Sequence, residues 1–310
     1  MQSKFKILTL DGGGSKGMYS IGILYELEKK LKSPLVNHFD GFYGCSTGAI
    51  IAALLARGES VSVIKDLYME NIPHIMNCWL PSTRSSRLRQ FLNDRFGKDK
   101  FDTVKKFLGI VSTSCDDKAP KIFKSDIKAA HGRKGSFESG FGATITDALM
   151  ASCAAKPFFK AITLSTNITK FNLIDGGFSA NNPTLFAIID ALKAFQIKKE
   201  DLIVINIGTG KFPTSLLPLP FQGLFNAIPF IVSGGFVTTL LDINTTTDSL
   251  IVELLLDDIK LLKFNNEFSD PTLSTNILES NKDKLTSLFN QGVRTFGNLE
   301  KDFDPIWSND

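Results

Sequence analysis

The chain has 310 residues, of which 43% are hydrophobic and 22% are charged, a composition typical of a globular protein rather than a disordered one. The formal net charge of +3 is too small to indicate a nucleic acid polymer as a partner. No two of the four cysteines have C-x-x-C spacing, so we expect neither a disulfide framework nor a metal site, and a reducing cytoplasm is the expected location. The first residues lack the apolar region of a signal peptide.

Short apolar runs alternate with helical patterns along the chain. The first run, KFKILTL at residues 4–10, predicts a buried strand, and after a glycine-rich loop the apolar spacing at residues 17–32 predicts a helix. The same criteria predict further strands at residues 39–44, 108–114, 121–125, 170–177 and 202–210. They predict further helices at residues 49–57, 60–70, 86–95, 144–155, 183–195 and 285–296. This alternation indicates an α/β fold in which helices cover both faces of a largely parallel sheet.

The glycine-rich loop DGGGSKG at residues 11–17 allows two interpretations. It matches the G-x-G-x-x-G pattern of a dinucleotide-binding turn, which makes a nicotinamide-dependent oxidoreductase one alternative function. That pattern also requires an acidic residue at the end of the second strand, whereas Asp40 lies at the start of that strand. The second interpretation is an oxyanion hole, because consecutive glycines expose backbone N–H groups near a helix N-terminus. Lys16 would add positive charge nearby.

A serine lies between two glycines in the segment GCSTG at residues 44–48. The G-x-S-x-G spacing, the preceding strand and the apolar following helix are the pattern of a nucleophile elbow, with Ser46 as the nucleophile. Gly44 and Gly48 would allow the strand and the helix to approach each other closely. The alternative is an ordinary Gly-Ser turn before a buried helix.

A catalytic serine needs a base, and the histidines of this chain do not fit that role. Hydrolases with this elbow have the order serine, acid, histidine, but no histidine follows His131, which lies in a polar loop. A carboxylate in a dry environment can replace histidine. The candidate is Asp175, which ends a predicted strand and precedes Gly176 and Gly177, although an Asp-Gly turn is the alternative. Asp11 is better placed to orient the glycine-rich loop.

These three motifs, in this order, resemble the patatin-like phospholipase family. The segments ALMASCAAKPFF at 148–159, DGGFSANNPTLFA at 175–187 and NIGTG at 206–210 resemble later blocks of the same family. The similarity covers residues 5–210, and beyond them no residue can be matched. The family implies lipid acyl hydrolysis by a Ser–Asp dyad on a three-layer α/β/α fold, with no cofactor.

The resemblance also implies roles for individual residues. Ser46 would be the nucleophile and Asp175 the base. The oxyanion hole would be formed by Gly12, Gly13, Gly14 and Thr47. Supporting positions in the motifs would be taken by Asp11, Lys16, Gly17, Gly44, Gly48, Gly176 and Gly177. Many members have arginine where this chain has Lys16, which retains the charge but loses the bidentate geometry.

The second part of the chain is expected to pack on the same domain. Residues 1–210 are the expected catalytic core, and residues 211–310 follow it. Segment 212–241 contains no charged residue and is long enough to cross a bilayer. Its prolines and glycines argue against one continuous helix, so we expect an apolar flap near the site that contacts a bilayer or another subunit. A buried connection is the alternative.

Two features bear on partners. The basic stretch that contains Arg84, Arg87 and Arg89 is expected to be a solvated face, and the alternative is a surface that attracts anionic headgroups or a charged activator. The segment at residues 4–31 is similar to patatin-like effectors of bacterial anti-phage defence, which cleave membrane phospholipids after binding a cyclic nucleotide. That similarity implies a protein peripheral to the membrane when active, with a cyclic-nucleotide activator; a homo-oligomer is a further expectation. The alternative function is a non-lipolytic binding protein on the same fold.

Overall fold

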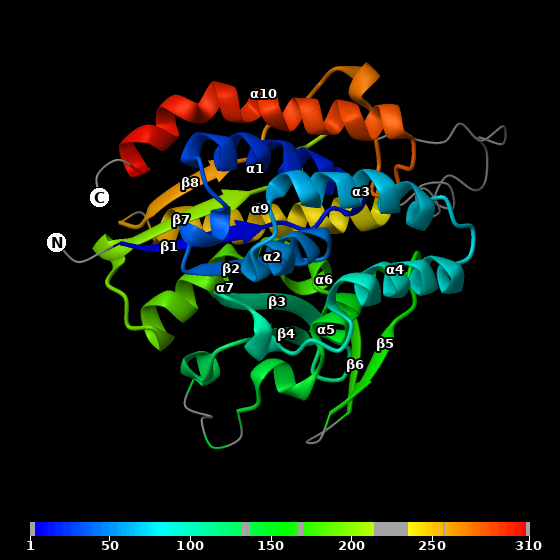
Figure 1. Cartoon of the computed structure of the whole chain (residues 1–310), viewed down its shortest axis with the longest axis horizontal. Helices are drawn as coiled ribbons and strands as arrows, with labels where there is room; N and C mark the ends of the chain where they lie inside the picture. Colours follow the sequence, from blue (N-terminus) through cyan, green and yellow to red (C-terminus); the bar gives the residue numbers. More distant parts are fainter. Residues whose placement is uncertain are drawn as a thin grey trace.

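The structure is a computed structural model, and it describes residues 4–131, 135, 137–166, 170–213, 235–256 and 258–307. One mixed sheet lies at the centre, with helices on both of its faces (Figure 1). Both halves of the chain contribute to this sheet. Its first strand, at residues 5–10, lies between a strand at residues 41–45 and a strand at residues 202–207.

Eight strands make up the sheet in the described residues. Five neighbouring strands run parallel to one another, in the order β3 (Phe107–Ser114), β2 (Gly41–Cys45), β1 (Phe5–Leu10), β7 (Leu202–Ile207) and β8 (Lys260–Phe264). The other three pair antiparallel beyond β3, namely β4 (Ala119–Lys124), β5 (Ile162–Ser165) and β6 (Lys170–Asp175). The predicted α/β fold is confirmed, and the antiparallel edge is an addition that the apolar pattern did not indicate.

The parallel strands form because both of their faces are buried. Every residue of β3 and β7 is buried, and strands of this kind read as continuous apolar runs rather than as alternating ones. Successive side chains point to opposite faces, so Ile7 packs with the core of one layer and Leu8 with the core of the other.

Helices complete a three-layer α/β/α arrangement. One face of the sheet is covered by α1 (Gly17–Leu31), α2 (Thr47–Arg57), α3 (Val61–Met76), α4 (Pro81–Phe96), α5 (Ile145–Ser152) and α10 (Lys282–Trp307). The other face is covered by α6 (Gly177–Ala180), α7 (Thr184–Ile189) and α9 (Gly235–Leu255). The helix expected at 60–70 continues to Met76, and the helix expected at 285–296 continues to Trp307. The helix expected at 183–195 is α7 followed by a π-helical turn at Asp190–Ala194.

The C-terminal part of the chain joins the same sheet, since β8 pairs with β7 and α10 packs along α1. Most of the uncharged segment 212–241 lies outside the described residues, so the expected flap is not part of this description. Its first residue, Phe212, stacks on Phe268 with ring centroids 4.7 Å apart, and its last residues begin α9. Within the described ranges, none of the helices combines the length and the apolar composition that crossing a bilayer requires.

Two strands share one edge of β3, and this arrangement positions the site. β4 pairs with β3 from Gly109 to Ser114 on one edge. On the other edge, β2 pairs up to Val111, and β6, which runs in the opposite direction, pairs from Ser112 onward. A strand has only two edges, so β2 and β6 meet end to end. The last residue of β6, Asp175, therefore faces the turn that follows β2.

The contact between α1 and α10 is unusually close. A Cβ atom at Gly292 would lie 2.0 Å from the carbonyl oxygen of Tyr19, and one at Gly22 would lie 2.1 Å from the carbonyl oxygen of Phe289. Neither position has room for a side chain. Gly297, which lies farther along α10, has no atom within 4 Å of such a Cβ.

We predict that Gly292→Ala separates the two helices and lowers the free energy of unfolding by roughly 2 kcal/mol, because overpacking outweighs the better helix propensity of alanine. Gly297→Ala is the matched control and should raise stability by up to about 1 kcal/mol. Thermal unfolding followed by circular dichroism measures both changes. Equal stability of the two variants would contradict the close packing.

Candidate active site

Ser46 lies in the turn between β2 and α2 with an uncommon backbone conformation. Its φ of 51° and ψ of −122° belong to a region that residues other than glycine rarely adopt. Surrounding contacts hold this conformation: the amide of Ser46 donates to Ser152 Oγ at 2.8 Å, and the carbonyl of Ser46 accepts the amide of Ala49 at 2.9 Å. This sharp strand-to-helix turn has the geometry of a nucleophile elbow.

The two glycines of the elbow bring three segments together. A Cβ atom at Gly44 would lie 2.3 Å from the carbonyl oxygen of Gly48, and one at Gly48 would lie 2.3 Å from the carbonyl oxygen of Leu10. Strand β2, helix α2 and the end of β1 are therefore closer than any side chain would permit. The close approach expected from the sequence is present, and it also includes β1.

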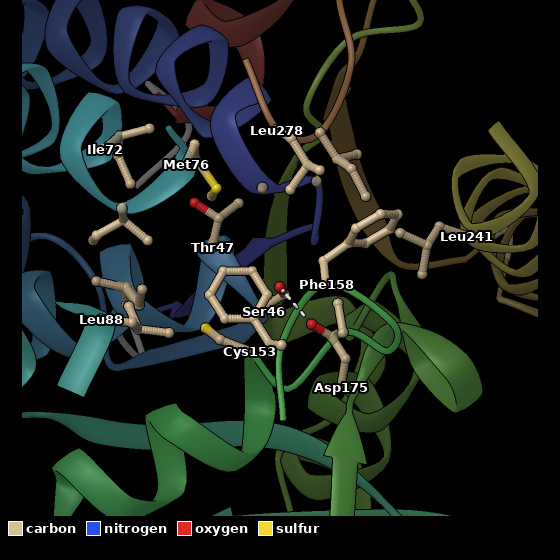
Figure 2. A pocket seen from close by; sticks show the side chains of 17 residues that line it. Ser46, Thr47, Ile72, Met76, Leu88, Cys153, Phe158, Asp175, Leu241 and Leu278 are labelled. Atoms are coloured by element: carbon tan, nitrogen blue, oxygen red, sulfur yellow. Dashed lines mark hydrogen bonds between the residues drawn. The ribbon is translucent and has the colours of Figure 1, made fainter. Parts of the chain in front are cut away.

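The hydroxyl of Ser46 contacts the carboxylate of Asp175. Ser46 Oγ donates a hydrogen bond to Asp175 Oδ2 at 2.8 Å, drawn as the dashed line in Figure 2. The other carboxylate oxygen, Oδ1, accepts the amide of Gly177 at 2.8 Å. The amide of Gly176 donates to the carbonyl of Ser152 at 3.2 Å, so Ser152 binds the backbone on both sides of the pair. The relative position of the two side chains is thus held by backbone contacts.

Burial changes the acidity of Asp175. The residue is 2% exposed, and desolvation raises the pKa of its carboxyl from 3.8 to about 7. The hydrogen bonds from Gly177 and Ser46 act in the opposite direction, because they stabilise the ionised form. A carboxyl group with a pKa near neutrality can accept a proton and return it at similar cost.

The three histidines lie apart from this pair. His38 contacts Ser33 Oγ at 2.6 Å, His131 contacts Asp190, and His74 is exposed on α3.

The part of the chain that the structure describes also lacks the acidic residue that a dinucleotide-binding role of the glycine-rich loop would require. Asp40 accepts the amide of Lys6 at 2.9 Å, at the end of β1 opposite to the glycine-rich loop.

The backbone amides of the glycine-rich loop are not equivalent. The amide of Gly12 donates to the carbonyl of Asn181 at 3.1 Å and is therefore already paired, which departs from its expected place in an oxyanion hole. Gly13, Gly14 and Thr47 line the same pocket as Ser46. Gly14 has a φ of +58°, and a Cβ atom there would lie 2.3 Å from the carbonyl oxygen of Ile277. Thr47 is the first residue of α2, so its amide has no acceptor within that helix.

The charged residues of this loop are buried behind it. Asp11 Oδ1 accepts a hydrogen bond from Asn206 Nδ2 at 2.8 Å, and burial raises the pKa of Asp11 to about 7. Lys16 is 6% exposed, and burial lowers the pKa of its ammonium group, while the carboxylate of Asp242 on α9 opposes this shift. The described residues that line the pocket beside Ser46 include neither Asp11 nor Lys16. The charge of Lys16 is thus held beside α9 and not presented to the pocket as expected.

The remaining motif glycine, Gly17, begins α1 at its contact with α2. A Cβ atom there would lie 2.5 Å from Thr47 Oγ1. Thr47 Oγ1 is also 3.0 Å from the hydroxyl of Tyr68 on α3, and that hydroxyl donates to the carbonyl of Thr47 at 3.0 Å. The start of α2 is therefore fixed by α1 and α3 together.

The Ser46–Asp175 pair lies in a narrow apolar pocket with about 570 Å³ of empty space, including its opening to solvent. Its walls come from α2, α3, α4, α9, the segment after α5 and the loop before α10 (Figure 2). The large apolar side chains of the lining are Ile50, Ile72, Ile75, Met76, Leu88, Phe158, Phe159, Leu241, Ile277 and Leu278. Such a pocket fits a flexible hydrocarbon group next to the serine.

Several residues of the site were not identified from the sequence. Leu241, Ile277 and Leu278 come from the part of the chain beyond the recognisable motifs, and their spacing carries no sign of a common pocket. The sequence does contain one indication of the role of Ser152. It lies in the apolar segment ALMASCAA, and a buried serine hydroxyl needs a hydrogen-bond partner. Its partners, the amide of Ser46 and the carbonyl of Val111, become visible only in the fold.

Comparison with known proteins finds a matching family model and several relatives. A family model described as patatin-like phospholipase matches residues 8–188. A cUMP-AMP-activated phospholipase from Escherichia coli is 41% identical over 297 residues, which cover 95% of this chain and 91% of that protein. A cGAMP-activated phospholipase from Escherichia coli (strain TW11681) is 27% identical over 238 residues, covering 69% of this chain and 65% of that protein. Among solved structures, VipD from Legionella pneumophila aligns with a TM-score of 0.48 and 11% identity, over 97% of this chain and 67% of that chain.

The family model covers more than half of the chain, and the first of these relatives is similar along almost all of it. The resemblance found in the motifs is therefore confirmed. The chain belongs to the patatin-like phospholipase family.

Proposed function

We propose that the protein hydrolyses carboxylic esters of membrane phospholipids through a Ser46–Asp175 dyad. The observation that carries this proposal is the 2.8 Å hydrogen bond from Ser46 Oγ to the buried carboxylate of Asp175. The raised pKa of that carboxyl, about 7, suits a group that takes a proton from the serine and later returns it. No histidine is needed for this exchange.

The reaction has two steps in this proposal. Ser46 Oγ attacks the ester carbonyl while its proton moves to Asp175 Oδ2, and a bond forms between Oγ and the acyl carbon. The ester C–O bond then breaks, and the leaving alcohol takes the proton from Asp175. Water repeats the sequence on the acyl-enzyme, with Asp175 as base, and releases the fatty acid.

The oxyanion of each tetrahedral intermediate needs hydrogen-bond donors close to Ser46. We assign this role to the amides of Gly13, Gly14 and Thr47, because these residues line the pocket beside the serine. Gly12 has a different role in this proposal, since its amide binds Asn181 and fixes the loop. The apolar lining of the pocket would hold the acyl chain of the substrate.

Two substitutions test the dyad. Ser46→Ala and Asp175→Asn should each lower fatty-acid release from phospholipid vesicles by roughly a thousandfold or more, because nucleophile and base act as a unit. Mass spectrometry of the lipids measures the release, and Ser86→Ala, which changes an exposed serine on α4, is the matched control.

Protein stability separates a catalytic loss from a folding defect. The pKa of Asp175 is raised from 3.8 to about 7 in the folded protein, so the free energy of unfolding falls as the pH rises between these values, and the full cost of the buried charge is present above pH 7. Asp175→Asn removes that cost, and its thermal midpoint at pH 8 should therefore equal or exceed that of the wild type. Wild-type fatty-acid release by either variant would refute the dyad.

We further propose that a cyclic nucleotide activates the protein at the cytoplasmic face of the membrane, as part of anti-phage defence. The 41% identity with a cUMP-AMP-activated phospholipase supports this regulation. The activator would shift the chain, alone or as a homo-oligomer, toward a state in which the pocket accepts lipid.

The activator is tested by adding cUMP-AMP or cGAMP to the purified protein with phospholipid vesicles. One of them should increase the rate of fatty-acid release by at least about tenfold, within the usual range of allosteric coupling. Linear dinucleotides of the same bases are the control, and light scattering records the size of the assembly. Unchanged rate and size with both cyclic dinucleotides would remove this part of the proposal.

A further inference from the structure

The turn between α3 and α4 exposes two large apolar side chains. Trp79 is 94% exposed, more than any other large hydrophobic residue of the described chain, and Leu80 beside it is 57% exposed. The turn lies at the outer edge of the molecule, on the right of Figure 1. A tryptophan side chain exposed to this extent forgoes the free energy that burial of its apolar surface would give.

A buried arginine joins this turn to the wall of the pocket. Arg84 on α4 is 6% exposed, and its guanidinium donates hydrogen bonds to the carbonyls of Met76, Cys78 and Phe158. Met76 and Phe158 line the pocket (Figure 2), and Cys78 precedes Trp79. The basic stretch around Arg84 predicted a solvated face. That prediction is wrong for Arg84, which is buried. Arg84 holds the exposed turn against the apolar wall that surrounds Ser46.

The surface around the turn is positive. The sequence contains no Asp or Glu between Glu70 and Asp94, and none between Asp147 and Asp175. These are the segments that form the turn and the pocket wall beside it. Their lysines and arginines with exposed side chains are Arg87, Lys156, Lys160 and Lys170, of which Lys170 lies on β6, away from the turn.

One of these cations is fixed next to the turn. The amide of Lys160 donates to Ser85 Oγ at 3.0 Å, and Ser85 follows Arg84 on α4. Arg89 differs from the others, because it forms a salt bridge with Asp147 at 2.9 Å and its charge is compensated. Arg87, Lys156 and Lys160 form no salt bridge with any residue that the structure describes, so the turn has net positive charge on the side where the pocket wall lies.

We propose that this turn, residues 77–80 with Lys156 and Lys160, is the docking surface for an anionic phospholipid bilayer, and we call it the α3–α4 tip. The proposal rests on the proposed hydrolysis of membrane phospholipids and identifies the surface that meets the lipid. Tryptophan prefers the interface between headgroups and acyl chains, leucine extends below it, and lysines are attracted by anionic headgroups. The absence of acidic residues from both segments complements the negative charge of such a bilayer.

The position of the tip shortens the path of the substrate. Trp79 lies three positions after Met76, a span of at most about 11 Å of chain. A bilayer that binds the tip is therefore next to the wall of the pocket, and an acyl chain need leave the hydrocarbon region only over a short distance to reach Ser46. Docking here would also hold the protein in one orientation, with α3 and α4 toward the lipid.

Tryptophan fluorescence tests the docking directly. The chain has two tryptophans, and Trp307 packs against Phe303 and Phe39, so Trp307→Phe leaves Trp79 as the single reporter. The experiment uses Trp307→Phe in the Ser46→Ala background, so that lipid is not consumed. Vesicles of phosphatidylglycerol and phosphatidylethanolamine should shift the emission of Trp79 to shorter wavelength, and brominated lipids should quench it. Pure phosphatidylcholine vesicles should give a much smaller change.

Substitutions in the tip test its contribution to binding. Trp79→Ser with Leu80→Ser, and separately Lys156→Glu with Lys160→Glu, should each weaken co-sedimentation with anionic vesicles by about tenfold or more. Ile127→Ser, which removes a 49% exposed apolar side chain far along the sequence, is the control and should bind as the parent does. Hydrolysis of a short-chain ester in solution, measured with Ser46 intact, should remain within about twofold of the wild type, because the tip does not touch the reacting atoms.

Three results would overturn the docking proposal. One is an unchanged Trp79 spectrum with anionic vesicles, both with and without a cyclic dinucleotide. Another is equal vesicle binding by the tip variants and the control. The last is an emission shift that depends on protein concentration without lipid, which would make the tip a contact between copies of the chain. Failure of the proposed function is a separate result, namely no fatty-acid release by the wild type from phospholipid dispersed in detergent.

Discussion

The site depends on one constraint: a carboxylate must be buried in hydrogen-bond contact with a serine at the point where two strands meet end to end. β2 and β6 occupy the same edge of β3 from opposite directions, and the turn after one strand faces the last residue of the other. The contact between Ser46 Oγ and Asp175 Oδ2 follows from this pairing. Its surroundings exclude water, which raises the pKa of the carboxyl to about 7.

Two residues of this arrangement, Ser46 and Asp175, lower the free energy of unfolding. Ser46 has a φ of 51°, a conformation that costs on the order of 1–3 kcal/mol for a residue with a side chain. Asp175 has a burial cost whenever it is ionised. The surrounding structure compensates with backbone contacts, especially those of Ser152, and with glycines that allow β1, β2 and α2 to approach closely. Ser152 and these glycines therefore determine whether the side chains of Ser46 and Asp175 can meet.

The sequence predicted the parts of the fold that depend on local pattern. The alternation of apolar strands and helices indicated the α/β class, and the glycines around Ser46 indicated an elbow. The partner of the serine followed from the absence of a suitable histidine and from the Asp-Gly-Gly segment. Each motif used in these inferences is formed by residues that are neighbours in the chain.

Features that depend on tertiary contacts were not predictable in the same way. The pairing of the Gly12 amide with Asn181, the burial of Lys16 beside α9 and the burial of Arg84 all arise from segments far apart in sequence. Arg84 and Lys16 are charged, so composition alone places them at the surface. The pocket residues Leu241, Ile277 and Leu278 lie in the part of the chain where no motif was recognised. Their role appears only when α9 and the loop before α10 are placed on the sheet.

The central claim is that Asp175, and no other group, takes the proton of Ser46. The most direct test is the pH dependence of covalent labelling of Ser46 by a soluble fluorophosphonate, followed by mass spectrometry. Deprotonation of Asp175 should control the rate, so labelling should increase about tenfold per pH unit below neutrality and level off above a midpoint near pH 7. A midpoint near the ordinary aspartate value of 3.8, or fast labelling that Asp175→Asn leaves intact, would contradict the account.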